Sequence, residues 1–186
     1  MDELELWNAA QEGDGRAFAR LFDTHQHRVL RHAAHLVSNP TLAEDIAATA
    51  FLELWRRRRD VRIVNGSVLP WLLVTTTNVA RNSERALRRY EKALRSMPRD
   101  PNYSADVVDL LDDPLSPQQA RLLRTAMETL SGPDSALLTL TALEGFSVAD
   151  AARALGMRPD TARVRLHRAK TKARQIIQNP YPEVSQ

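Results

Sequence analysis

The stretch Ser147–Arg174, SVADAARALGMRPDTARVRLHRAKTKAR, predicts two helices joined by a tight turn. Ser147 is a favourable N-cap residue, and Asp150 follows it at the spacing of a capping box. Gly156 favours the end of the first helix at Leu155, because glycine readily adopts the left-handed conformation that closes helices. Pro159 suits the first turn of a second helix, where its missing N–H is not needed. A short helix, a turn and a longer basic helix form the pattern of a helix-turn-helix.

The second predicted helix has two unlike faces. A narrow apolar stripe, expected to pack on the first helix, contains Ala162, Leu166, Ala169 and Ala173. The opposite side carries Val164, His167 and Thr171. From residue 156 to residue 174 there are seven Lys or Arg and one acidic residue. A basic face that projects directly after the turn predicts contact with DNA, and a solvated surface is the alternative interpretation.

Charge is unevenly distributed along the 186 residues. Residues 1–95 contain 15 Lys or Arg against 12 Asp or Glu, residues 96–117 one against five, and residues 118–186 ten against six. Two basic blocks around an acidic connector predict two contacts with a polyanion. The connector also contains four Pro and no sustained periodicity. We therefore expect two small domains, 1–95 and 118–186, joined by a linker over residues 96–117.

Several classes of protein are not expected. The absence of Cys excludes disulfides and Cys-based zinc sites, and it suits the cytoplasm. No apolar run approaches the ~20 residues of a membrane span, and the acidic N-terminus is unlike a signal peptide. His25, His27, His32 and His35 lack an obvious carboxylate that would complete a metal site. No catalytic triad order or phosphate-binding Gly-rich loop occurs, so we expect no enzyme, no metal and no cofactor.

The first half of the chain also shows helical periodicity. We expect a short helix over 4–11, and a longer one after residue 15 that ends at Ser38-Asn39-Pro40. Two further helices are expected over 41–59 and 69–95, separated by a loop over 60–68 that contains Asn65-Gly66. No stretch alternates as a strand would. The predicted fold class is all-α, with two small helical domains.

Three motifs, in this order, resemble the extracytoplasmic-function (ECF) sigma factors of bacterial RNA polymerase. Residues 43–55, AEDIAATAFLELW, are similar to the family's polymerase-binding helix. Residues 71–82, WLLVTTTNVARN, are similar to the helix that reads one strand of the −10 promoter element. Residues 161–170, TARVRLHRAK, resemble the family's closing T-V-K-S-R-L-x-R-A-R run, and the Leu130–Ser147 segment before it resembles the family's L-P and E-G-x-S pattern.

The resemblance implies site residues by position. Contact with core polymerase is implied for Asp45, Thr49, Leu52, Glu53 and Arg56. Contact with the −10 element, including a flipped base held by the loop, is implied for Asn65, Gly66, Ser67, Trp71, Asn78, Arg81, Arg85 and Arg88. Contact with the −35 element is implied for Arg158, Thr161, Arg163, Val164, Arg165, His167, Arg168, Lys170, Thr171, Lys172 and Arg174. Among these, we expect Arg165 to lean toward the packed side of its helix and hold a phosphate, and Lys172 to reach only phosphate or solvent.

The sequence departs from the family pattern at three places. Ala48 and Thr49 stand where Gln and an acid are usual, and Thr76-Thr77 where Ala-Arg is usual. Val164 replaces the usual Ser, so it is suited to contact a thymine methyl group. Trp71 is expected in the core, and Asn78 is open to a purely structural role, as a cap or a bridge between helices.

The predicted function is that of an alternative sigma factor. It would bind core RNA polymerase, double-stranded promoter DNA and the melted −10 strand, and the family implies an anti-sigma factor as a further partner. Two alternatives remain at this point: a stand-alone helix-turn-helix regulator, and an adaptor that binds polymerase without DNA specificity. No membrane insertion and no small-molecule substrate are expected.

Overall fold

A computed structural model of the chain describes residues 2–94 and 117–178. The first range forms α1 (Glu3–Gln11), α2 (Gly15–Leu36), α3 (Pro40–Arg56) and α4 (Leu69–Leu94). The second forms α5 (Pro117–Thr129), α6 (Gly132–Leu138), the π-helical turn η2 (Thr139–Leu143), α7 (Val148–Ala154) and α8 (Pro159–Gln178). These two ranges contain no strand, which confirms the predicted all-α class.

Side chains at the helix starts explain where the first three helices begin. Asp2 and Glu5 form a capping box at α1, and Asp14 accepts hydrogen bonds from the first backbone N–H groups of α2. Asn39 caps α3, with Pro40 at its first position. The predicted helices of the first half are therefore present, although α3 ends at Arg56, three residues earlier than expected.

The first half is a bundle whose core lies between α1, α2, α3 and α4. Large apolar side chains with almost no exposure fill it, among them Trp7, Leu21, Ile46, Leu54 and Leu72. Around the edge, the rings of Phe22 and Phe51 tilt against each other with centroids 4.7 Å apart. Edge-to-face contacts of this kind add to the burial energy that joins α2 to α3.

The second half packs α8 against α5, α6 and α7. The stripe predicted to face the first helix is buried, because Ala162, Leu166, Ala169 and Ala173 all have little exposure. These mostly small residues allow the helices to approach closely. They leave the longer basic side chains of α8 on the outside.

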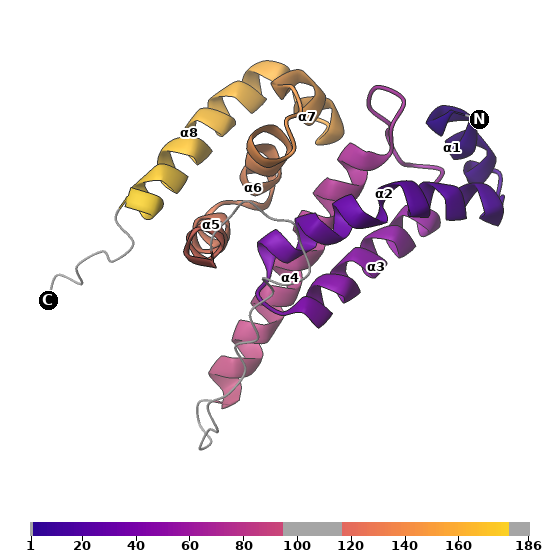
Figure 1. The fold of residues 1–186 in the computed structure, drawn as a ribbon. Helices are drawn as coiled ribbons and strands as arrows, with labels where there is room; N and C mark the ends of the chain where they lie inside the picture. The colour runs from indigo at the N-terminus through magenta and orange to yellow at the C-terminus, as the bar shows by residue number, and fades with distance from the viewer. Residues whose placement is uncertain (1, 95–116, 179–186) are drawn as a thin grey trace, which may run out of the picture.

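The two halves also contact each other (Figure 1). α4 packs against α6 and α7, and α2 packs against α5. The linker expected over residues 96–117 lies almost entirely outside the described ranges. Within those ranges, no helix combines the length and apolar character needed to cross a membrane.

Candidate nucleic-acid interface

The turn between α7 and α8 has the predicted geometry. The Ser147 hydroxyl accepts a hydrogen bond from the Asp150 backbone N–H at 3.1 Å and donates one to the Asp150 carboxylate at 2.8 Å. Gly156 has a φ of 65°, in the left-handed region that favours glycine. The Met157 N–H donates to the Ala152 carbonyl across this turn, which closes α7 and redirects the chain into α8.

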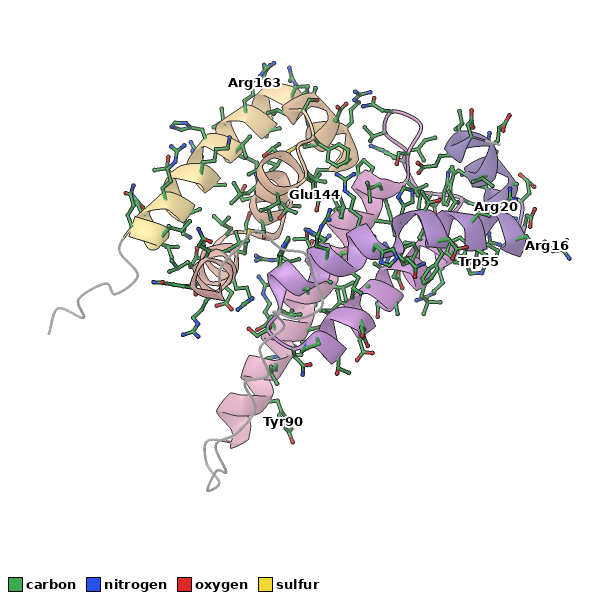
Figure 2. All side chains as sticks on the ribbon, in the orientation of Figure 1. Arg16, Arg20, Trp55, Tyr90, Glu144 and Arg163 are labelled. Atoms are coloured by element: carbon green, nitrogen blue, oxygen red, sulfur yellow. The ribbon has the colours of Figure 1, made fainter. Side chains whose placement is uncertain are left out.

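The outer face of α8 is exposed along its length. Val164 is 53% exposed, and Arg163 points away from the rest of the fold (Figure 2). The implied −35 residues that are exposed are Arg158, Thr161, Arg163, Val164, His167, Arg168, Thr171, Lys172 and Arg174. Arg163 contacts Asp160 one turn earlier, with 2.6 Å between Nη1 and Oδ1. Both side chains are exposed, so this ion pair is weak and does not prevent Arg163 from contacting DNA.

Two cations of α8 are held by the protein itself. Arg165 leans toward the packed side, as expected, and its Nε lies 2.7 Å from the Asp134 carboxylate at the start of α6. Lys172 differs from the expectation that it reaches only phosphate or solvent, because its Nζ donates to the Thr129 carbonyl at 2.5 Å. The helical wheel missed this contact because it places residues around one helix and does not locate the end of α5.

The loop between α3 and α4 is a tight turn. Val64 and Ser67 exchange two backbone hydrogen bonds, and Asn65 and Gly66 between them both have positive φ, at 54° and 76°. Asn and Gly adopt this conformation at the lowest cost. Ser67 faces inward: its hydroxyl donates to Glu3 at 2.9 Å, and the same carboxylate accepts from the Val68 N–H.

Glu3 is a residue that the sequence analysis missed. Its carboxylate also lies 2.8 Å from Nε2 of His25, so one side chain ties α1, α2 and the loop together. Burial works to raise the pKa of Glu3, but the hydrogen bonds from His25, Val68 and Ser67 outweigh it and lower the pKa. Nothing near residue 3 in the sequence identifies partners that lie more than 60 residues away.

The helix α4 presents the other candidates for the −10 strand. Asn78 is exposed, Arg81 is half-buried, and Arg85 is exposed. Trp71 is partly buried and packs on the core, as predicted. The side chain of Arg88 lies outside the described residues.

The Thr76-Thr77 departure has a structural explanation. Both threonines are buried, and their hydroxyls donate to the Leu72 and Leu73 carbonyls one turn earlier. Because the Thr77 hydroxyl proton is used in this way, its oxygen accepts a hydrogen bond from Nε2 of buried His32, at 3.0 Å. Position 77 faces the core, where an unpaired cation would be unfavourable.

The candidate polymerase-binding residues lie on one outer face of α3. Leu52 is 57% exposed, and Asp45, Thr49 and Arg56 are exposed around it. Glu53 is half-buried and bridges Arg56 and Arg57 at 2.7 and 2.9 Å. One exposed leucine does not by itself mark a binding surface, so the assignment of this face depends on the resemblance of α3 to the family's polymerase-binding helix.

An exposed basic helix that follows a tight turn, beside a second helical unit, defines a DNA-binding protein of the helix-turn-helix class. Comparison with family models identifies the family more closely. Residues 21–91 match sigma-70 region 2, and residues 120–172 match sigma-70 region 4. The chain is 31% identical to the RNA polymerase sigma factor CarQ of Myxococcus xanthus over 90% of its own length and 92% of that protein's. It is also 29% identical to the ECF sigma factor SigM of Mycobacterium tuberculosis, over 94% and 84%.

Solved structures show the same fold. CnrH in complex with the cytosolic domain of CnrY aligns with a TM-score of 0.62 at 20% identity, covering 96% of this chain and 99% of that one. The sigma factor RpoE of Bartonella quintana, in complex with the anti-sigma factor NepR, aligns with a TM-score of 0.56 at 18% identity, covering 87% and 96%. At these identities the likeness concerns the fold alone.

The chain therefore belongs to the sigma-70 family of RNA polymerase sigma factors, in its ECF group. Its function is promoter-specific initiation of transcription together with RNA polymerase and promoter DNA. The regulator and adaptor alternatives are not favoured, since neither explains a region 2 and a region 4 in one chain.

Proposed function

We propose that the two halves divide the work of promoter recognition, with α8 reading the −35 element in the major groove and α4 with its preceding loop reading the melted −10 strand. The observation that carries this proposal is the exposed basic face of α8 after the Gly156 turn. The outer residues of α8 lie on the side opposite the buried stripe and are therefore exposed, as a recognition helix requires. The domain boundaries at residues 95 and 118 are part of the same proposal.

The face of α3 around Leu52 is proposed to bind core polymerase. It lies on the outer side of a helix whose opposite side is buried, so it remains available to a partner. We propose that the protein is a binding subunit of the polymerase without catalysis of its own, and that it acts in the cytoplasm, where the polymerase works. An anti-sigma factor is proposed as a further partner, by analogy with the complexes of similar fold.

The test combines reconstitution with promoter selection. Core polymerase with the full chain is incubated with a library of double-stranded DNA, and bound fragments are sequenced. The proposal expects two conserved blocks at a fixed spacing, and no comparable enrichment by either component alone. Specific, tight binding by the free chain at physiological salt would contradict it.

A substitution tests the polymerase-binding face. Leu52→Arg should abolish co-purification with core polymerase while the helical circular dichroism spectrum is retained. Leu4→Arg is the matched control, because Leu4 is another exposed leucine, on α1, at 41% exposure. Normal co-purification of the folded Leu52→Arg variant would show that this face is not the binding site.

A further inference from the structure

One carboxylate oxygen collects three hydrogen bonds behind the loop that precedes α4. Oε1 of Glu3, on α1, lies 2.8 Å from Nε2 of His25, on α2. The same oxygen accepts from the Ser67 hydroxyl and from the Val68 N–H, each at 2.9 Å. His25 is only 6% exposed, and its Nε2 carries the proton in this contact, because an ionised carboxylate can only accept. These four residues, the Glu3 cluster, are joined by charge-assisted hydrogen bonds, which are about twice as strong as neutral ones.

The Ser67 hydroxyl is engaged on both sides. It donates to Glu3, and its oxygen accepts from the Leu69 N–H at 3.1 Å. Leu69 is the first residue of α4, so this hydroxyl satisfies a backbone N–H group that a helix start leaves without a partner. The Glu3 carboxylate is also favourable there, at the positive end of the helix dipole. The resemblance to the family implied that Ser67 contacts DNA, but the only proton of its hydroxyl is already bonded to Glu3.

The tip of the loop depends on this support. Asn65 and Gly66 both have positive φ, and for a residue other than glycine this conformation is uncommon. Behind the tip, Val64 and Ser67 exchange two backbone hydrogen bonds as an isolated bridge, and a single two-stranded turn of this kind is marginally stable by itself. Glu3 holds the Ser67 side of this bridge from 64 positions earlier in the chain, and in Figure 1 the loop lies beside α1. The helix α1 therefore fixes where the tip points.

We propose that Glu3, held in place by His25, is a positioning residue for recognition of the −10 strand. It fixes the loop so that the tip residues, Asn65 and Gly66, meet the unpaired base. Ser67 then acts through Glu3, without contacting DNA. The inference rests on the proposed function, since it takes the loop as part of the −10-reading surface. A surface that reads bases needs its polar groups held within about 0.5 Å of the productive geometry, and the Glu3 cluster supplies this constraint.

The first measurement tests the Glu3 cluster without polymerase or DNA. In the full chain, amide hydrogen exchange followed by NMR should show the Val68 N–H exchanging about tenfold faster or more in Glu3→Gln, because a hydrogen bond to a charged group is worth at least about that factor. The matched control is Glu12→Gln, the same charge change at an exposed position at the other end of α1, which should leave Val68 unchanged. Unchanged Val68 exchange in a folded Glu3→Gln variant would overturn the proposal.

The second measurement tests recognition in the complex with core polymerase. Single-stranded −10 probes that carry each of the four bases in turn give the ratio of dissociation constants between the best and the worst base. Glu3→Gln should narrow this ratio at one position by about fivefold or more, the least that one good base contact provides. Affinity for a duplex that carries only the −35 element should be unchanged. Ser67→Ala should narrow the same ratio, whereas Ser67→Thr keeps the hydroxyl and should retain it.

A double-mutant cycle decides how Ser67 acts. If it acts through Glu3, Ser67→Ala should cause no further loss of base preference in the Glu3→Gln background. Additive losses would show that Ser67 contacts the base, and an unchanged preference in Glu3→Gln would show that recognition does not depend on Glu3; either result overturns the proposal. A parent complex without any −10 preference would contradict the proposed function itself, and amide exchange distinguishes that outcome because it reports the Glu3 cluster without DNA.

Discussion

Arg165 of α8 donates from Nε to the Asp134 carboxylate of α6 at 2.7 Å, and from Nη2 to the Ser131 hydroxyl at 3.0 Å. This joins the proposed recognition helix to the N-terminal end of α6, where Ser131 is the cap. Arg165 therefore positions α8 against α6. The neighbouring Arg163 pairs only with Asp160 of its own helix and remains on the outer face.

The first prediction follows from this pair. Arg165→Ala should lower the free energy of unfolding by about 1 kcal/mol, the size of a partly exposed ion pair with good geometry. Base preference at −35 should be unchanged. Urea unfolding measures the first effect, and selection of bound sequences by the reconstituted polymerase measures the second. Altered base preference at unchanged stability would show that Arg165 reads DNA.

Asp134 gives this prediction a pH dependence. Burial works to raise its pKa, but hydrogen bonds from Ser131 and Arg165 outweigh burial and lower the pKa below the usual range. A carboxyl whose pKa is lower when folded stabilises the protein above its unfolded pKa of about 3.9, and the stabilisation is lost as the pH falls through the folded pKa. Asp134→Asn should remove this contribution to the fall in the free energy of unfolding at acidic pH.

The second prediction concerns base recognition. Arg163→Ala should cost about 1–3 kcal/mol of promoter binding and relax preference at one −35 position, because its exposed guanidinium follows the turn and can reach a base edge. Arg174→Ala, an equally exposed cation near the end of α8, is the control. It should weaken all sequences alike and reduce the salt dependence by about one unit of slope.

The third prediction concerns strand opening. Asn78→Ala should leave the closed promoter complex intact and impair opening at −10, because the amide can donate to and accept from an unpaired base edge. Run-off transcription on linear and pre-melted templates separates the two steps, and a pre-melted bubble should rescue the variant at least in part. No rescue, together with unchanged −10 preference, would mean that Asn78 has only a structural role.

The fourth prediction concerns His32. Burial lowers its pKa to about 3, and the charges of His35 and, to a smaller extent, Arg28 act in the same direction, while a hydrogen bond with the Leu73 backbone opposes them. Its Nε2 faces Thr77, and Glu144 lies near Nδ1. The unfolded chain binds the proton first, at a pKa of about 6.5, so the free energy of unfolding should be greatest above that pH. It should fall between about pH 6.5 and 3, by up to about 1.4 kcal/mol per pH unit.

Urea unfolding at several pH values measures this slope. His32→Gln should reduce this slope by about 1.4 kcal/mol per pH unit, which corresponds to one fewer proton bound on unfolding, whatever its effect on absolute stability. His27→Gln is the control, since His27 lies exposed on the same helix. An unchanged slope in His32→Gln would show that another group binds the proton.

Reasoning from the sequence alone predicted the four helices of the first half, the turn at Gly156 and the buried stripe of α8. These depend on contacts within a few residues, where capping, glycine conformation and helical periodicity act directly. It also identified the family, because three motifs keep their order along the chain. It placed Val164 and Leu52 outside for the same reason, since helical period alone decides which side they occupy.

The contacts of the long polar side chains became evident only from the packing of the helices. Glu3 bonding to Ser67, Lys172 to Thr129, and Arg28 to Glu144 all join residues more than 40 positions apart. Such contacts depend on how helices pack, and a long flexible side chain has several possible partners until that packing is fixed. The packing of the two halves against each other belongs to this second class, because charge blocks along the chain do not specify which opposite charges will meet.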